Sequence, residues 1–533
     1  VDLKLFETTN SSTLSQGLNF QPGVRVETNC QNCGFQQVRI NGLDGPYTQI
    51  LIDSRPVFSA LSGVYGLEQI PASMIERVEV MRGGGSALFG SSAIAGTINI
   101  ITKEPLRNSG QLSHTLTALG GGSSFDNNTS LNASLVTDDH RAGLYIFGQN
   151  RHRSGYDYDG DGFTELPKLK NQTVGFRSYL KTSTYSKLTF EYHHMQEFRR
   201  GGDMLDRPPH EAHIAEQLQH SIDGGSLKFD YFSPDEKNRL SIFASAANTD
   251  RDSYYGPGND PLKAYGKTTD LTAMGGAQYV HTFDKCFFMP SDLTAGLEYN
   301  RDRLKDNMWG YDRHTDQTVN IYSAFLQNEW KNDRWGILIG GRLDKHNMVD
   351  NVIFSPRANL RFNPTQNINL RLSYSSGFRA PQAFDEDMHI ENVGGTVAMI
   401  ERAKNLKEEK SQSFSASADM YHRFGVFQTN FLIEGFYTRL TDVFVLGEPY
   451  DRGDGILVKT RSNGPGAKVM GLTLEGKVAY LSILQIQAGL TLQRSRYDEP
   501  HKWHDDAPAE KKIFRTPDTY GYFTATYTPI KPL

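Results

Sequence analysis

Apolar and polar residues alternate with a period of two along most of the chain after Pro105. Residues 368–374 carry apolar side chains at even positions and polar ones at odd positions, and residues 293–300 and 413–420 repeat the alternation. Because successive side chains of a strand point to opposite faces, the pattern predicts β-strands with one apolar face. A soluble sandwich would alternate in the same way. Strands of this length with aromatic residues near their ends favour a transmembrane β-barrel.

The connections between these segments alternate between short and long. Short turns are predicted at residues 137–140, 182–185, 233–236, 331–333 and 363–365. Long, polar connections are predicted at residues 150–171, 197–217, 251–268, 302–317, 378–411 and 497–516. Transmembrane barrels have short turns on one side of the membrane and long loops on the other. Counting the passes predicts about eighteen strands, the last of them at Tyr520 to Tyr527.

Composition agrees with this interpretation. The chain has 533 residues, of which 38% are hydrophobic. It contains no run of apolar residues long enough for a transmembrane helix. The formal net charge is -5, and this absence of basic bias argues against a nucleic-acid partner. Motifs such as GxSxG, HExxH and the P-loop are absent from the sequence, so we predict neither an enzyme nor a catalytic cofactor.

One segment before the barrel carries a specific signature. Residues 75–105 read IERVEVMRGGGSALFGSSAIAGTINIITKEP, two β-rich runs joined by glycine, serine and alanine. Small residues there allow a tight loop with close backbone approach. The order of residues resembles the plug domain of TonB-dependent outer-membrane transporters, whose usual form is close to IERIEVLRGPSSALYGSGAIGGVINIITK. The match has no gap over these positions, and Gly84 stands where the family usually has proline.

The resemblance implies a two-part architecture. It is mainly β, with an N-terminal α+β plug over residues 1–105 inside a transmembrane antiparallel barrel over residues 106–533. The family barrel has 22 strands, so about four strands are expected to be absent from this sequence, because a barrel cannot leave an open edge in lipid. No convincing TonB box is identifiable before Leu14. Within the plug, the candidates for charged contacts with the barrel are Arg77, Glu79 and Arg82.

The resemblance also implies a function. It predicts TonB-dependent active transport of a scarce metal chelate across the outer membrane of a Gram-negative bacterium, with TonB bound at the periplasmic face. The expected cargo is an iron complex, either haem or a siderophore. Cobalamin or copper uptake by the same mechanism is the first alternative, and a passive gated porin or surface-binding barrel is the second. Whether a surface lipoprotein caps the barrel stays open.

The first long connection contains a candidate calcium loop. Asp157, Asp159 and Asp161 alternate with other residues and are followed by glycine, as in the first half of an EF-hand loop. The closing glutamate of such a loop is replaced by Lys168, although Glu165 lies nearby. Ca²⁺ would order this loop rather than be transported. The alternative is a solvated turn rich in aspartate and glycine.

A CxxC pair precedes the first predicted plug strand. In an oxidising periplasm, Cys30 and Cys33 are expected to form a local disulfide. The alternatives are a soft-metal site or a redox pair, and a four-ligand zinc site would need two further partners. Cys286 is distant in the sequence and is expected to be an unpaired thiol.

Two further sites are candidates for cargo binding. His210 and His213 could chelate a borderline or soft metal if their segment is helical, but polar loops often carry histidine without a ligand role. Phe378 and Arg379 begin a sequence that resembles the FRAP motif of haem and some siderophore receptors. His389 follows at a distance suited to an axial haem ligand; otherwise it is an ordinary loop histidine.

Overall fold

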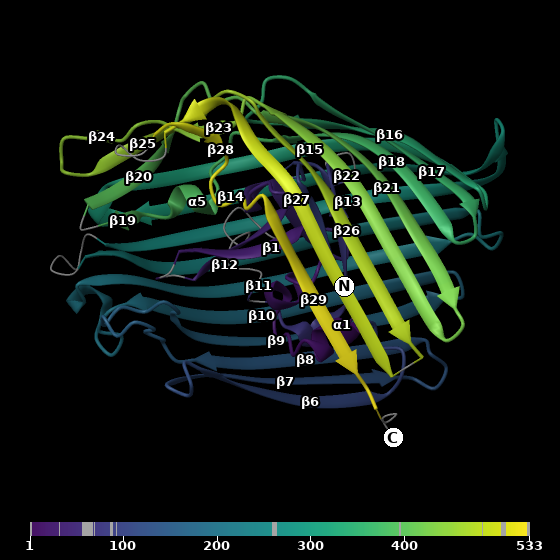
Figure 1. Cartoon of the computed structure of the whole chain (residues 1–533), viewed down its shortest axis with the longest axis horizontal. Coiled ribbons are helices and arrows are strands. Elements are labelled where there is room, and N and C mark those ends of the chain that lie inside the picture. Colours follow the sequence, from purple (N-terminus) through teal and green to yellow (C-terminus); the bar gives the residue numbers. More distant parts are fainter. Residues whose placement is uncertain are drawn as a thin grey trace.

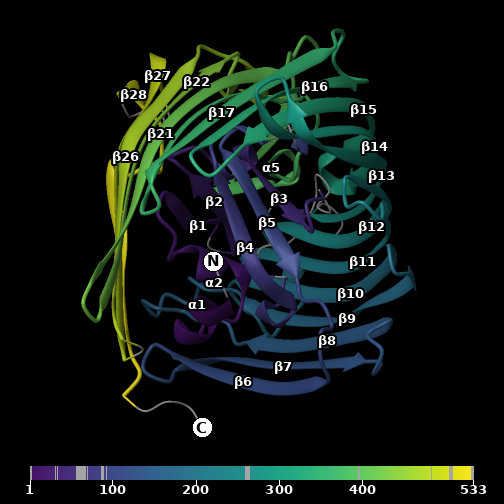
Figure 2. The same cartoon turned by 90° about the vertical axis from the view of Figure 1, so that its right-hand side faces the viewer.

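The computed structural model describes residues 3–529 except 31, 33, 56–67, 69, 86–88, 92, 258–263, 394–395, 482 and 503–507. A small N-terminal body, coloured purple, lies inside a large barrel of antiparallel strands (Figure 1). The view along the barrel shows β2 to β5 of this body surrounded by the barrel strands (Figure 2). The molecule is therefore a plug within a barrel, as the sequence predicts.

The plug combines short helices with two small sheets. Its elements are α1 (Leu3–Thr8), α2 (Leu14–Leu18), β1 (Val24–Cys30), β2 (Phe35–Ile40), η1 (Gly45–Tyr47), β3 (Thr48–Ile52), η2 (Ala72–Met74), β4 (Ile75–Arg82) and β5 (Gly96–Thr102). Strands β1 and β2 form a hairpin, and β5 lies between parallel β3 and antiparallel β4. Strand β5 is central and buried on both faces, and the polar side chains of Thr97 and Asn99 are buried in it together with the isoleucines. No helix in the described part of the chain has the length and apolar character to cross a membrane.

Within the described residues, the barrel sheet is closed and contains nineteen strands, with β29 next to β6. The strands are β6 (Ser109–Leu119), β7 (Ser124–Val136), β8 (Ala142–Arg153), β9 (Lys168–Ser183), β10 (Ser186–Gly202), β11 (Ile214–Phe232), β12 (Asn238–Pro257), β13 (Tyr265–Cys286), β14 (Met289–Met308), β15 (Arg313–Lys331), β16 (Trp335–His346), β17 (Ile353–Thr365), β18 (Ile368–Arg379), β21 (Glu409–Phe424), β22 (Phe427–Thr441), β26 (Ala467–Tyr480), β27 (Leu484–His501), β28 (Glu510–Lys512) and β29 (Thr519–Tyr527). Strand β28 has three residues, and the other eighteen agree with the count made from the sequence.

The two faces of the barrel strands differ in a way that decides between a membrane barrel and a soluble sandwich. On β21, Ser411 and Ser413 are buried toward the interior, whereas Phe414 is 49% exposed. Leu297 on β14 is 66% exposed, and Thr294 on the same strand is buried. Apolar side chains thus cover the outside and polar ones fill the inside, which is the reverse of a soluble β-protein.

Several long connections are shorter than predicted. Strand β10 continues to Gly202 and β11 begins at Ile214, so only residues 203–213 of the predicted loop 197–217 lie outside the paired strands. The predicted loop 302–317 is reduced to residues 309–312 between β14 and β15. Polar composition suggested loops there, but strands of 17–22 residues extend well beyond the ~10 residues that cross a bilayer. Outside the bilayer both strand faces can be polar.

A small second sheet covers the end of the barrel that carries the long connections. The connection after β18 forms α5 (Asp385–Met388), β19 (Glu391–Val393) and β20 (Thr396–Arg402). The connection after β22, which the sequence did not single out, forms β23 (Phe444–Leu446), β24 (Tyr450–Asp451) and β25 (Leu457–Asn463). Strands β20 and β25 pair in parallel and join the two connections into one sheet (Figure 1).

Candidate functional site

A cavity of about 900 Å³ lies at the long-connection end, between the plug and the barrel wall. Its floor is the plug segment from Gln37 to Tyr47, at the end of β2 and in η1. Its walls come from the ends of β18, β22, β26 and β27 and from strands β20, β23 and β25 of the small sheet. The volume lies at the upper end of the range for small-molecule sites.

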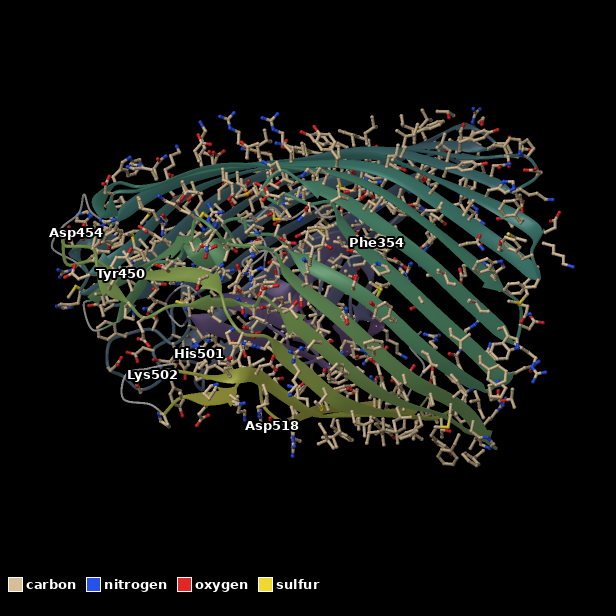
Figure 3. All side chains as sticks on the ribbon, turned by 90° about the horizontal axis from the view of Figure 1, so that it is seen from above. Phe354, Tyr450, Asp454, His501, Lys502 and Asp518 are labelled. Atoms are coloured by element: carbon tan, nitrogen blue, oxygen red, sulfur yellow. The ribbon has the colours of Figure 1, made fainter. Side chains whose placement is uncertain are left out.

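The cavity lining is basic. The basic residues among the described lining side chains are Arg39, Arg379, Lys459, Arg461 and Lys502. The acidic ones are Asp44 and Glu448. Arg461 is paired with Asp387 at 2.7 Å, and Arg39 with Glu27 at 2.8 Å, so part of the positive charge is compensated. His501 and Lys502 lie at the same end of the barrel as Tyr450 and Asp454 (Figure 3). Counting the lining side chains alone, five cations stand against two carboxylates, a balance that favours an anionic solute.

Aromatic rings line the same cavity and hold one of its cations. Tyr47, Phe444 and Tyr497 contribute to the lining. The guanidinium of Arg379 lies 4.1 Å from the ring centroid of Phe384 and 5.4 Å from that of Phe444, and 3.7 Å from the Glu409 carboxylate. Arg379 is therefore fixed in orientation by cation–π contacts and an ion pair.

The plug contributes a hydroxyl donor to this wall. Tyr47 donates a hydrogen bond of 2.8 Å to the Glu409 carboxylate. Burial, and then the charge of Glu409, raises the pKa of Tyr47 well above its usual value. The hydroxyl thus keeps its proton and ties the plug to the barrel. Phe378, the neighbour of Arg379, is only 1% exposed and packs with Val349, Ile353 and Ala380. Phe378 therefore packs within the wall of the cavity.

The structure brings together two of the sequence candidates that lie far apart in the chain. The Cys30 thiol, at the end of β1, is 3.1 Å from the Glu216 carboxylate on β11. The Nε2 atom of His389 is 3.8 Å from the same carboxylate oxygen. Its ring lies 5.2 Å from that of Tyr255. Cys33, the second cysteine of the CxxC pair, lies outside the described residues, so the predicted disulfide stays a prediction.

His210 and His213 are placed differently. The 3₁₀ helix η3 (Pro209–Glu211) includes His210 but ends before His213. His210 bonds the Tyr265 hydroxyl at 2.9 Å, whereas His213 is mostly exposed and bonds Asp203 at 2.5 Å. Neither belongs to the groups of three His, Cys, Asp or Glu side chains that converge within the described part of the chain.

The carboxylates of Asp157, Asp159 and Asp161 do converge, with ligand atoms within 4.8 Å of one another. Asp157 accepts backbone hydrogen bonds from Gly160 at 2.7 Å and Gly162 at 2.9 Å, which fold the loop back on itself. Glu165 accepts the backbone N–H of Tyr158 and closes the other side of the loop. The oxygen set suits a hard cation.

The charged plug residues singled out from the sequence have different surroundings. Arg82 forms an ion pair of 2.5 Å with Glu434 on β22, which joins plug and barrel. Arg77 and Glu79 pair with each other at 2.8 Å on β4, and about half of each side chain is exposed.

A stronger plug–barrel contact has no signal in the sequence. Glu68 is buried and lies 2.8 Å from Arg199, 3.5 Å from Arg151 and 3.7 Å from Arg153 on the barrel wall. Burial by itself would raise the pKa of Glu68, but the three arginines, Arg199 foremost, outweigh it and lower this pKa from 4.5 to about 2. The Glu68 carboxylate of the plug thus offsets the positive charge of three arginines on the barrel wall. Only a pattern of inward-facing arginines on neighbouring strands could have indicated it.

Comparison with known proteins identifies the family to which this architecture belongs. Residues 1–97 match the TonB-dependent receptor plug domain, and residues 96–532 match the TonB-dependent receptor-like β-barrel. The vitamin B12 transporter BtuB of Vibrio vulnificus is 25% identical over 395 residues, which is 71% of this chain and 59% of that protein. The ferric enterobactin receptor of Pseudomonas aeruginosa is 36% identical over 107 residues, 18% of this chain and 14% of that one.

Among solved structures, the siderophore receptor PirA from Pseudomonas aeruginosa is similar, with a TM-score of 0.76 and 17% identity over 93% of this chain and 85% of that one. The chain belongs to the TonB-dependent receptor family. Members of this family are Gram-negative outer-membrane proteins and transporters, not enzymes, and the predictions of location and of a non-enzymatic class are confirmed by this membership. The chain spans 59% of the length of the curated B12 transporter that it matches.

Proposed function

We propose that the protein takes up an anionic metal chelate of the ferric siderophore kind across the outer membrane, in a step energised through TonB. The observation that carries this proposal is the basic and aromatic cavity between the plug and the small outer sheet. A ferric tris-catecholate has six deprotonated oxygens around one Fe³⁺ and so carries net negative charge, and its aromatic rings can stack on tyrosine and phenylalanine.

The contacts that hold the plug support the transport part of this proposal. The plug lies in the lumen and meets the barrel partly through polar contacts, such as Arg82 with Glu434 and Tyr47 with Glu409, and partly through an apolar cluster that includes Phe147 and Phe436 of the barrel. Polar contacts can be exchanged for water when the plug moves, whereas a dry apolar interface could not open at modest cost. We propose that cargo binds on the outer side of the plug and that TonB pulls from the periplasmic side.

Cobalamin is the second candidate. It is favoured by the 25% identity to a vitamin B12 transporter. Cobalamin is a large solute of low net charge, so it would make little use of the basic lining. Haem is the third candidate. His389, its proposed axial ligand, lies beside Cys30 and Glu216 and not in the described cavity lining. The structure therefore supports haem less than it supports an anionic chelate.

Uptake measurements in one host separate these outcomes. The protein is expressed in a strain that lacks its own iron-chelate, haem and cobalamin receptors, with and without TonB. We expect accumulation of radiolabelled iron from a ferric tris-catecholate, and we expect it to cease without TonB. Uptake that continues without TonB would indicate a passive porin. Accumulation of only cobalamin or only haem would replace the anionic-chelate proposal.

The cavity cations provide a quantitative test. Replacing Lys459 and Lys502 together by glutamine removes two cations of the lining and is expected to weaken binding of the tris-catecholate about tenfold to a hundredfold, since a charge-assisted contact contributes about 1.5–3 kcal/mol. Cobalamin binding should hardly change. Lys285→Gln, an exposed position at the opposite end of the barrel, is the matched control. Equal affinity in the double variant and the control would remove the cavity as the binding site.

We also propose that the loop of Asp157, Asp159 and Asp161 binds Ca²⁺. Replacing all three by asparagine should abolish a Ca²⁺-dependent rise in the thermal midpoint of the purified protein. At a Ca²⁺ concentration a hundred times Kd, binding contributes about 2.7 kcal/mol, which corresponds to a few degrees in a chain of this size. Asp138→Asn, in an exposed turn at the other end, is the control. A Ca²⁺ effect that persists in the triple variant would show that the cation binds elsewhere.

A further inference from the structure

We propose that Cys30, Glu216 and His389 form a binding site for a borderline divalent transition cation such as Zn²⁺, at the junction of plug, barrel and outer connection. Cys30 is the last residue of plug strand β1, and Glu216 lies near the start of barrel strand β11. His389 directly follows α5 in the connection after β18. The three ligands therefore come from three independent parts of the fold, and one cation would link all of them.

The distances suit direct ligation. In a tetrahedral site with metal–ligand distances of about 2.0–2.3 Å, neighbouring ligand atoms are about 3.4–3.6 Å apart. The Cys30 sulfur and a Glu216 oxygen are 3.1 Å apart, and His389 Nε2 and the same oxygen are 3.8 Å apart. All three ligand atoms lie within 4.8 Å of one another. Shifts of about half an ångström would bring the two distances to the Glu216 oxygen to tetrahedral edges, and side-chain rotation would close the third edge, between Cys30 and His389, from at most 4.8 Å.

The imidazole is oriented as a ligand. His389 Nδ1 is 3.2 Å from the backbone carbonyl oxygen of Ile390. A carbonyl can only accept, so Nδ1 carries the proton and donates it there. In neutral histidine this leaves the lone pair of Nε2 facing the Glu216 carboxylate. Two acceptors face each other favourably only with a proton or a metal cation between them. A backbone carbonyl that fixes the tautomer in this way is typical of metal-bound histidine.

Charge and surroundings select the class of cation. A thiolate and a carboxylate together supply two negative charges, which balance a divalent ion, while the neutral imidazole adds none. Sulfur and nitrogen donors favour zinc and its neighbours over calcium or magnesium. The Glu216 and His389 side chains are 7% and 19% exposed. Cys30 packs against a buried cluster that includes Tyr255 and Met399. Low solvent access strengthens such a centre.

The site differs from the cavity and from the aspartate loop in both donors and position. Its residues do not occur in the described cavity lining. Binding would cross-link β1 of the plug to β11 of the barrel wall, with His389 holding the outer connection over both. Because the plug must move for transport, the cation would act as a removable restraint on that movement. This role does not depend on the identity of the cargo.

Zinc titration of the full-length purified protein tests the proposal. With Zn²⁺ alone as the probe, calorimetry should show one high-affinity site per chain in reduced protein. Cys30→Ser, Glu216→Gln and His389→Ala should each weaken binding at least tenfold. With Co²⁺ as the probe, a thiolate-to-metal charge-transfer absorption should appear in the natural protein and in Cys286→Ser, and should be lost in Cys30→Ser. Zn²⁺ affinity that is unchanged in Cys30→Ser would overturn the assignment.

A second measurement uses the natural sequence, so that it does not depend on folding of a variant. Alkylation of Cys30, followed by mass spectrometry, should slow at least tenfold when Zn²⁺ is present, while alkylation of Cys286 keeps its rate. Cys286 is the last residue of β13, in the β13–β14 hairpin at the other end of the barrel, and is an internal reference. Equal protection of both thiols, or a Cys30 held in a disulfide in protein isolated from the outer membrane, would rule out the proposed site.

Discussion

Replacing Glu68 by glutamine is expected to loosen the plug from the barrel. The carboxylate is buried among Arg199, Arg151 and Arg153, and its removal leaves three buried guanidinium groups with less compensating charge. Breaking a buried ion pair from one side costs about 3–5 kcal/mol. Arg199 and Arg151 retain Glu197 and Asp126 as partners. We therefore expect the attachment of the plug to be weakened by about 3 kcal/mol. The barrel itself should stay folded, because its strand pairing is unchanged.

Protease accessibility of the plug and leakage of a solute too large for porins measure this effect. Both should increase in Glu68→Gln. Glu79→Gln is the matched control, because Glu79 is half exposed and its partners Arg77 and Asn99 both belong to the plug, and an exposed pair contributes little. If Glu68→Gln and Glu79→Gln showed equal protease accessibility and equal leakage, the buried ion cluster would not hold the plug.

The same cluster predicts a dependence on pH with a definite sign. The pKa of Glu68 is lowered to about 2 from 4.5. A carboxyl with a depressed pKa contributes stability above its unfolded pKa, and this contribution is lost as the pH falls through the folded value. The difference corresponds to about 3 kcal/mol. Plug release should therefore rise as the pH falls from about 4.5 toward 2, and Glu68→Gln should show less of this dependence.

Gly96→Ala is expected to disrupt the plug sheet. Gly96 begins the central strand β5 with a φ of +155°, and a Cβ atom there would lie 2.1 Å from the Met81 carbonyl oxygen on β4. Backbone atoms cannot yield as a side-chain end can, so β4 and β5 must separate locally. We expect a loss of about 3 kcal/mol or more. Little folded protein should reach the membrane, and the plug of the remainder should be cleaved readily.

Gly83→Ala is the control for the conformational part of that cost. Gly83 also has a positive φ, +84°, but an added Cβ would meet no atom within 4 Å. Only the left-handed penalty of about 1–2 kcal/mol remains. Expression and protease resistance of Gly83→Ala should fall far less than those of Gly96→Ala. Similar losses in both variants would show that the contact with Met81 is not the cause.

Much of the architecture could be predicted from local sequence patterns. The alternation at residues 413–420 gave the strand and its two faces, and Ser413 inside with Phe414 outside shows the polarity expected of a membrane barrel. Predictions of connections were weaker where polar strands extend beyond the bilayer, as in β14 and β15. Where a strand extends beyond the bilayer, water contacts both of its faces, so a polar composition does not mark the end of the strand.

The candidate sites could be predicted only in part. The aspartate loop was found because its three carboxylates lie within five consecutive residues, and local turns bring them together. Of the cavity cations the sequence singled out Arg379 alone, because the others come from the plug, the barrel and the outer sheet. Lys459 and Arg461 lie in a connection whose sequence carries no distinguishing motif.

The sequence alone predicted a plug within a transmembrane barrel: the resemblance of residues 75–105 to the family's plug indicated the plug, and the period-two alternation, which acts through neighbouring residues, indicated the barrel strands. The tertiary structure alone decided which distant groups meet. Glu68 and Arg199 are 131 residues apart, and Cys30 and Glu216 are 186 residues apart. Barrel closure around the plug sets those distances. No local pattern records them, since each partner is chosen by the register of strands and not by its own surroundings in the chain.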